Sequence, residues 1–126
     1  MTVTLNHTIV PAADHTAAAR FFATVMGLEQ LPPDGAGGHF APVRVNDQLT
    51  LDFMAVDPAT TEGHHLAFDV DPETFDAILG RLNDLDVPYG DDPSRPDNRR
   101  TEHPLCARGL YFTDASGNLY EVMSPR

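Results

Sequence analysis

Residues 109–125, Gly-Leu-Tyr-Phe-Thr-Asp-Ala-Ser-Gly-Asn-Leu-Tyr-Glu-Val-Met-Ser-Pro, predict a β-hairpin at the end of the chain. Residues 110–113 and 119–123 are short runs rich in apolar and aromatic residues, as strands are. The residues between them form turns readily, and Gly117 supplies the positive φ that closes a short hairpin. Glu121 falls in the middle of the second run, on an otherwise apolar face, so its carboxylate needs a partner.

Length and charge limit what the protein can be. The 126 residues suffice for one domain with a modest core. The formal net charge of −11 argues against nucleic acids and anionic membrane surfaces as partners. No basic leader is evident, and no apolar run approaches the roughly 20 residues of a membrane span. The single cysteine, Cys106, excludes an internal disulfide framework and has no adjacent base to activate it. We expect a reduced, cytoplasmic protein.

The N-terminal residues predict a strand followed by a helix. Residues 2–10 alternate as a strand does, and the side chains predicted to point inward are those of Val3, Leu5, His7 and Ile9. The helix is expected to begin at a cap on Asp14 or Thr16 and to end at Gly27.

The next segment predicts a pair of strands between two loops. Residues 32–38 form a loop rich in proline and glycine, and residues 57–63 form a second loop. Residues 40–45 and 49–54 predict the strands, with Asp52 on the face opposite the apolar side chains of its strand.

The second half repeats this order. Residues 64–70 predict a strand that carries His65, and a helix with a clear apolar stripe follows from a cap at Asp71 or Thr74. A short strand is expected at residues 87–90. The polar, proline-rich stretch 91–104 predicts a long loop, and it is the best candidate for a mobile lid.

Histidine and carboxylate recur at equivalent places in the two halves. His7 and His65 lie 58 residues apart, and Asp52 and Glu121 lie 69 residues apart. The two separations differ because the second half contains the longer loop at 91–104. The sequence therefore predicts two tandem modules, at about 1–57 and 63–126.

These four residues suit a divalent metal ion. Two neutral imidazoles, those of His7 and His65, and the carboxylate of Glu121 would leave positions open for substrate, with Asp52 as a possible fourth ligand. A bound ion would also explain a charged Glu121 on an inward face. The remaining histidines are expected elsewhere, with His64 on the opposite face and with His15, His39 and His103 solvated.

The sequence resembles the vicinal oxygen chelate (VOC) superfamily, which includes glyoxalase I, extradiol dioxygenases, fosfomycin-resistance transferases and bleomycin-resistance proteins. Four stretches carry the resemblance, and together they span almost the whole chain: Leu-Asn-His-Thr-Ile at 5–9, the helix end at 21–28, His-Leu-Ala-Phe-Asp-Val at 65–70, and the last hairpin at 111–121.

The resemblance implies an α+β fold, a single domain over residues 1–126. Its two βαβββ modules would form a curved mixed sheet of half-barrels around a metal cleft, with the helices outside. It also implies that His7, His65 and Glu121 are the metal ligands, and that Asp52 stands where glyoxalases have a Glu or Gln ligand. Asp52, one methylene shorter, could instead be a base. The resemblance leaves the metal open among Fe, Ni, Zn, Mn and Mg.

Three functions compete under this resemblance. The first is a glyoxalase-I-like lyase or isomerase, in which the metal stabilises an enediolate of a small oxygen-chelating substrate and Glu121 or Asp52 moves a proton. The second is an extradiol-type dioxygenase with Fe(II), which needs a base such as His103 or Tyr111. The third is a metal-free binding or antibiotic-resistance protein.

Two further expectations concern the last hairpin and the assembly. Tyr111 and Arg108 flank the hairpin and are candidates for orienting an anionic group, although a surface role is expected for Arg108. Because the family often pairs modules between subunits, we expect a homodimer that binds a small-molecule substrate and neither nucleic acid nor membrane.

Overall fold

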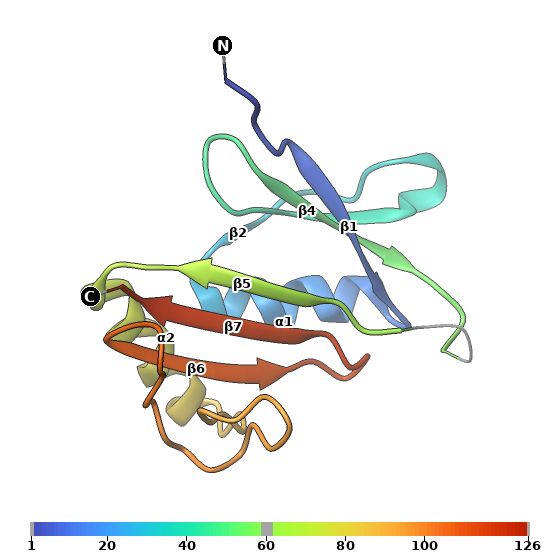
Figure 1. Ribbon diagram of the computed structural model, residues 1–126. Helices are drawn as coiled ribbons and strands as arrows, with labels where there is room; N and C mark the ends of the chain where they lie inside the picture. Colours follow the sequence, from blue (N-terminus) through green and yellow to red (C-terminus); the bar gives the residue numbers. More distant parts are fainter. Residues whose placement is uncertain (1, 59–61, 126) are drawn as a thin grey trace. The chain divides into compact units, whose positions relative to one another are not determined.

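The computed structural model describes residues 2–58 and 62–125. The chain divides into two compact units, Met1–Glu62 and Gly63–Arg126, each with its own sheet and its own helix. The two mixed sheets have four and three strands, and neither closes into a barrel, so the fold is α+β as predicted (Figure 1). The expected loop at 57–63 lies partly outside the described residues.

The first unit has the order βαβββ. Its elements are β1 (His7–Ala12), α1 (His15–Met26), β2 (Glu29–Gln30), a short 3₁₀ turn η1 (Ala36–Gly38), β3 (Phe40–Arg44) and β4 (Thr50–Ala55). The strands run in the order β1-β4-β3-β2, and β1 is parallel to β4. Helix α1 begins at Asp14, whose side chain accepts from the Ala17 N–H, and ends at Gly27 in the left-handed conformation, both as predicted.

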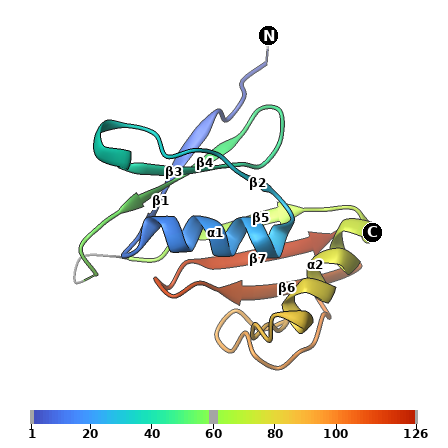
Figure 2. The same cartoon turned by 180° about the vertical axis from the view of Figure 1, so that it is seen from behind.

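The second unit repeats the order with one strand fewer. Its elements are β5 (His65–Asp69), α2 (Pro72–Asp84), β6 (Arg108–Thr113) and β7 (Leu119–Ser124). The strand order is β5-β7-β6, with β5 parallel to β7, and α2 packs against β7 (Figure 2). In place of the strand predicted at 87–90, the described chain has a single β-bridge from Gly90 to Tyr111.

The sheet registers recur in the two units. In the first unit His7 pairs with Thr50, two residues before Asp52. In the second unit His65 pairs with Leu119, two residues before Glu121. Because successive side chains on a strand alternate between faces, each histidine shares a sheet face with its carboxylate. The two pairs are thus structurally equivalent.

The predicted first strand is wrong in its bounds and in its buried face. Strand β1 begins only at His7 and continues to Ala12, although Pro11 was expected to end it. The completely buried side chains are Val10 and Ala12, whereas Val3 is 97% exposed and Leu5 64%. An alternating pattern identifies two faces but not the one that a helix covers.

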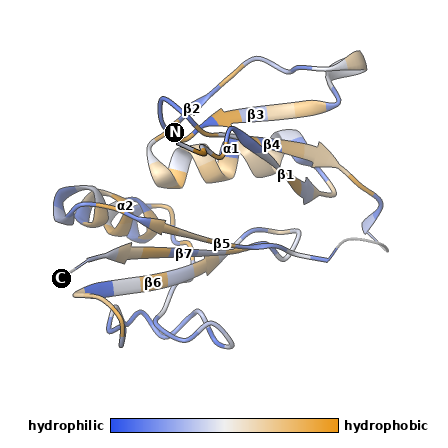
Figure 3. Cartoon of the chain, turned by 45° about the horizontal axis from the view of Figure 1, so that its top comes forward, coloured by the Kyte–Doolittle hydropathy of each residue, from blue (hydrophilic) through white to orange (hydrophobic). Residues whose placement is uncertain are grey.

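Each unit has an apolar core between its sheet and its helix. The fully buried large side chains of the first unit are Phe22, Phe53, Leu51, Val10, Val25 and Val43. Those of the second unit are Tyr120, Phe75, Phe112, Ile78, Leu82 and Leu110. The orange colour of β3 and β4 in Figure 3 reflects this apolar content, whereas the stretch between α2 and β6 is mostly hydrophilic.

The last hairpin turns as the sequence predicts. The Asp114 carboxylate accepts from the backbone N–H groups of Ser116 and Asn118, and Gly117 has a φ of 84°. The same carboxylate accepts from the hydroxyl of the buried Tyr120 at 2.8 Å, which joins the turn to the core. None of the helices in the described part of the chain has the length and apolarity to cross a membrane.

Candidate functional site

The candidate site is built around Glu121 on the central strand of the second sheet. Strand β7 lies between β5 and β6, and Glu121 stands opposite Ala67 on one side and Tyr111 on the other. Residues opposite one another share a face, as do residues two apart on one strand. Glu121, Tyr111 and His65 therefore project from the same face of the sheet.

Three side chains donate hydrogen bonds to the Glu121 carboxylate. His65 Nε2 lies 2.8 Å from Oε1, and His103 Nε2 lies 2.8 Å from Oε2. The Tyr111 hydroxyl lies 3.2 Å from Oε2. The expected partner of this buried carboxylate is thus a set of hydrogen-bond donors, and the charge does not need a metal ion to be stabilised.

The three donors determine the protonation of Glu121. Burial by itself raises the pKa of this carboxyl, but the hydrogen bonds from His103, His65 and Tyr111 outweigh burial and lower the pKa below its ordinary value. Glu121 is therefore a carboxylate at neutral pH, and each of its three partners is the donor.

Tyr111 is not suited to act as a base. Burial raises the pKa of its phenol, and the nearby negative charge of Glu121 and the hydrogen bond to Glu121 raise it further. The phenol therefore stays protonated at neutral pH and donates to the carboxylate. A catalytic role of Tyr111 stays a prediction.

The side chain of His103 is buried, so the prediction that it would be solvated is wrong. Its side chain is only 4% exposed. The backbone N–H of Leu105 lies 3.1 Å from Nδ1, and an N–H can only donate, so Nδ1 accepts and the ring proton resides on Nε2. Neither ring nitrogen of His103 is left to remove a proton from a substrate, contrary to its expected role as a base.

A glycine makes room for the His103 ring. A Cβ atom on Gly109 would meet ring and Cβ atoms of His103 at 2.7–2.8 Å, closer than real contacts allow. The Gly109 N–H also donates to the Thr101 carbonyl at 3.0 Å, which ties the loop to β6. Gly109 therefore lets the loop place its histidine directly over the strand.

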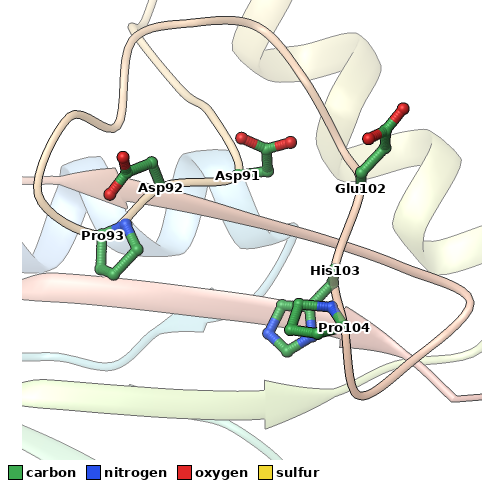
Figure 4. Close-up of a pocket in the computed structure, with 6 residues that line it drawn as sticks. All are labelled: Asp91, Asp92, Pro93, Glu102, His103 and Pro104. Atoms are coloured by element: carbon green, nitrogen blue, oxygen red, sulfur yellow. The ribbon is translucent and has the colours of Figure 1, made fainter.

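The 91–104 loop is folded back on the second unit. The Asn98 side chain accepts from the N–H groups of Asp91 and Arg100 and donates to the Asp91 carboxylate. A pocket of about 570 Å³ opens beside His103, and Figure 4 shows its lining from two stretches of this one loop, 91–93 and 102–104. The lining residues are Asp91, Asp92, Pro93, Glu102, His103 and Pro104.

The equivalent pair in the first unit, His7 and Asp52, has different surroundings. His7 is exposed, and its Nδ1 lies 2.9 Å from Asn6 Oδ1. Asp52 is half-buried on the same sheet face as His7, opposite the buried Leu51 and Phe53, as predicted. Its carboxylate makes no hydrogen bond or ion pair with any residue that the structure describes.

The donor chemistry fits a divalent metal ion. Imidazole and carboxylate are ligands for Fe, Zn, Ni and Mn, and the second unit brings His65 and Glu121 together on one face. His7, the third expected ligand, is in the other unit. Over residues 2–58 and 62–125, no group of three His, Cys, Asp or Glu side chains is arranged to hold a metal ion. The ligand set therefore stays a prediction.

The other candidates lie outside this cluster. Arg108 donates to the Asp76 carboxylate at 2.8 Å and lies over the Phe75 ring, so it joins β6 to α2, in agreement with a surface role. Cys106 is buried, and its thiol contacts the Arg108 carbonyl. His64 is exposed, and its backbone groups bond to residues 118 and 119.

Comparisons with known proteins identify the family. No family model matches the sequence, and the comparison with curated proteins finds no match. Among solved structures, Oxidase ChaP-H2 is 36% identical, with a TM-score of 0.89 over 100% of this chain and 96% of that chain. Oxidase ChaP-H1 is 34% identical, with a TM-score of 0.83 over 99% of this chain and 98% of that chain.

A more distant structure has the same fold. A glyoxalase/dioxygenase from Nostoc punctiforme is 24% identical, with a TM-score of 0.71 over 98% of this chain and 91% of that chain. The matches span nearly the full length of both proteins, and the sheet registers carry the duplicated histidine–carboxylate pairs. The chain belongs to the vicinal oxygen chelate superfamily.

Proposed function

We propose that the protein is a divalent-metal-dependent enzyme that oxidises a small substrate with two neighbouring oxygen atoms. The observation that carries the proposal is the contrast between two equivalent carboxylates. Glu121 is held by three donors, whereas Asp52 has no donor among the described residues. Two carboxylates in such different environments are suited to different roles, one as a fixed ligand and one as a base.

Each residue of the candidate site then has a role of its own. His7, His65 and Glu121 would hold the ion, which supplies Lewis acidity toward the two substrate oxygens. Asp52 would accept a proton from a substrate hydroxyl. Tyr111 and His103 would keep Glu121 in place, because their hydrogens are already committed to it.

The oxidative reading is preferred because two structures at least 34% identical to this chain are named oxidases. For a catechol-type substrate with Fe(II), both atoms of O₂ enter the product while a ring carbon–carbon bond breaks, so no external reductant is needed. A second candidate is a lyase or isomerase of the glyoxalase I type, for which Asp52 would serve equally well as the base.

Metal binding is the first test of the proposal. Untagged protein is purified without oxygen, loaded with Fe(II) and analysed for metal. We expect about one equivalent in the wild type and a loss of it in His7→Ala, His65→Ala and Glu121→Gln. His64→Ala is the matched control, since this exposed neighbour of His65 points to the opposite face. Wild-type protein without stoichiometric metal would leave only the metal-free binding function.

Turnover is the second test. Oxygen uptake is measured with catechols under Fe(II), and product formation from a hemithioacetal is measured under Ni(II) or Zn(II). We expect Asp52→Asn to retain the metal and to lose turnover by about 100-fold or more, as removal of a general base does. Loss of the metal in Asp52→Asn would instead make Asp52 a ligand. Product formed from the hemithioacetal without oxygen uptake would favour the lyase or isomerase.

A further inference from the structure

We propose that His103 is a positioning residue that fixes the orientation of Glu121 through a single directed hydrogen bond. The inference rests on the proposed function in one respect, namely that Glu121 is a metal ligand. It adds a residue from the long loop, outside the two repeated histidine–carboxylate pairs, to the machinery of the site.

The direction of the hydrogen bonds carries the argument. The Leu105 N–H donates to His103 Nδ1, which leaves the ring proton on Nε2, and Nε2 lies 2.8 Å from Glu121 Oε2. The two hydrogen bonds that link the Leu105 amide, the ring and the carboxylate therefore both donate in the direction of Glu121. Because the Leu105 N–H fixes this tautomer, His103 can only donate to Glu121 and its Nε2 cannot bind a metal. No hydrogen bond among the described residues fixes the tautomer of His65 in this way, so its Nε2 can exchange its proton for an ion.

The two carboxylate oxygens are thereby made different. Oε2 accepts from both His103 and Tyr111, whereas Oε1 faces only His65. Two donors on buried side chains hold Oε2, so the carboxylate cannot rotate without losing both. Oε1, beside the expected ligand His65, is the oxygen that remains for an ion. Residues that orient a ligand in this way commonly change metal affinity 10- to 100-fold when they are removed.

The backbone supports the same geometry. The ring packs over Gly109, where any side chain would collide with it, and the Gly109 N–H holds Thr101 two residues before the histidine. The ring is therefore positioned by β6 itself. Tyr111, the second donor to Oε2, lies two residues after Gly109 on the same strand. Strand and loop together form the support of the carboxylate.

Two substitutions separate positioning of Glu121 from support of the loop. In His103→Asn the amide oxygen can replace Nδ1 and keep the Leu105 hydrogen bond, but nothing reaches Glu121. In His103→Gln the longer amide can replace Nε2 as the donor to Glu121. With Co²⁺ alone as the probe, we expect the Kd to rise 10- to 100-fold in His103→Asn and to stay within about threefold of wild type in His103→Gln.

A glycine substitution reaches the same contact without altering the histidine. Gly109→Ala should displace the ring and weaken Co²⁺ binding as His103→Asn does. Gly80→Ala is the matched control, since a Cβ at this helix position would meet nothing within 4 Å beyond the adjacent residues and the backbone of its own helix. Wild-type affinity in His103→Asn, or equal losses in His103→Asn and His103→Gln, would overturn the proposal in favour of a purely structural role.

A metal-free measurement separates this inference from the proposed function. Nitrogen NMR of the histidine rings should report His103 as the Nε2–H tautomer, with a slowly exchanging Nε2 proton that becomes fast in Glu121→Ala. An Nδ1–H tautomer, or exchange unchanged in Glu121→Ala, would overturn the inference whatever the metal content. Failure of the wild type to bind any metal would overturn the proposed function, and the NMR result would still decide the role of His103.

Discussion

Glu121 and its three partners carry most of the chemistry at the scale of single residues. A carboxylate on an apolar strand face is costly unless its charge is compensated, and here the compensation comes from two imidazoles and a phenol. The same hydrogen bonds that offset this cost also restrict the rotation of the carboxylate, because two of them hold Oε2 on buried donors. Glu121 is therefore suited to hold something in place rather than to carry a proton.

The lowered pKa of Glu121 predicts an acid dependence of stability. A carboxyl whose pKa is lower in the folded than in the unfolded state stabilises the fold at pH values above its ordinary pKa of 4.5. This contribution is lost as the pH falls through the pKa of the folded state. We expect the difference in unfolding free energy between wild type and Glu121→Gln, measured with urea, to shrink from pH 7 to pH 3. A difference that stays constant would contradict the lowered pKa.

The 91–104 loop is the decisive structure at the scale of elements. It has little regular secondary structure, yet Asn98 ties Asp91 to Arg100, the Arg99 N–H donates to the Tyr89 carbonyl, and the Thr101 carbonyl accepts from β6. A cavity forms within the loop and places His103 at its wall (Figure 4). The loop expected to be a lid thus also supplies a side chain to the site.

Removing the Asn98 clamp should loosen this loop. Asn98→Ala deletes three hydrogen bonds, each contributing about 1 kcal/mol on balance. We expect amide hydrogen exchange at Asp91 and Arg100 to accelerate tenfold or more.

Asn46→Ala serves as the control for that experiment. It removes a similar side-chain clamp from the turn that Gln48 and Leu49 complete in the first unit. Exchange in the 91–104 loop should be unchanged in this variant. Equal acceleration in the two variants would point to a general loss of stability rather than a local clamp.

The duplication of a βαβββ unit organises the chain at the scale of the whole molecule. Each unit pairs its first strand in parallel with its last, in the same register relative to its histidine and its carboxylate. The units have diverged at the carboxylate, since Glu121 is held by three donors and Asp52 by none that the structure describes. A duplicated fold can in this way provide two carboxylates with separate roles.

The expected homodimer is a prediction at this scale. Strand β1 is the edge of its sheet, and Val3 and Leu5 precede it with 97% and 64% of their surfaces exposed. Exposed apolar side chains beside a free edge favour association with another chain. We expect sedimentation of a dimer at micromolar concentration and a shift toward monomer in Val3→Ser/Leu5→Ser. A wild type that sediments only as monomer would contradict the prediction.

Local rules in the sequence were sufficient for much of the fold. The caps at Asp14 and Asp71, the left-handed Gly27 and the turn at Gly117 depend on contacts within a few residues, so their chemistry is legible along the chain. The repeat was also legible, because a histidine and a carboxylate recur on the first and last strands of each half although the 91–104 loop changes the spacing between them. The misfit of Glu121 among apolar neighbours already indicated a buried partner.

Long-range packing decided the rest. Alternation along β1 defined two faces, but only the packing of the sheet selected Val10 and Ala12 for burial. His103 gave no signal, because a histidine in a proline-rich loop has neither periodicity nor a neighbouring motif. Its place beside Glu121 depends on contacts with Gly109 and Leu105 that form only when the loop folds onto β6. Side chains that meet through loop closure are beyond any pattern read along the chain.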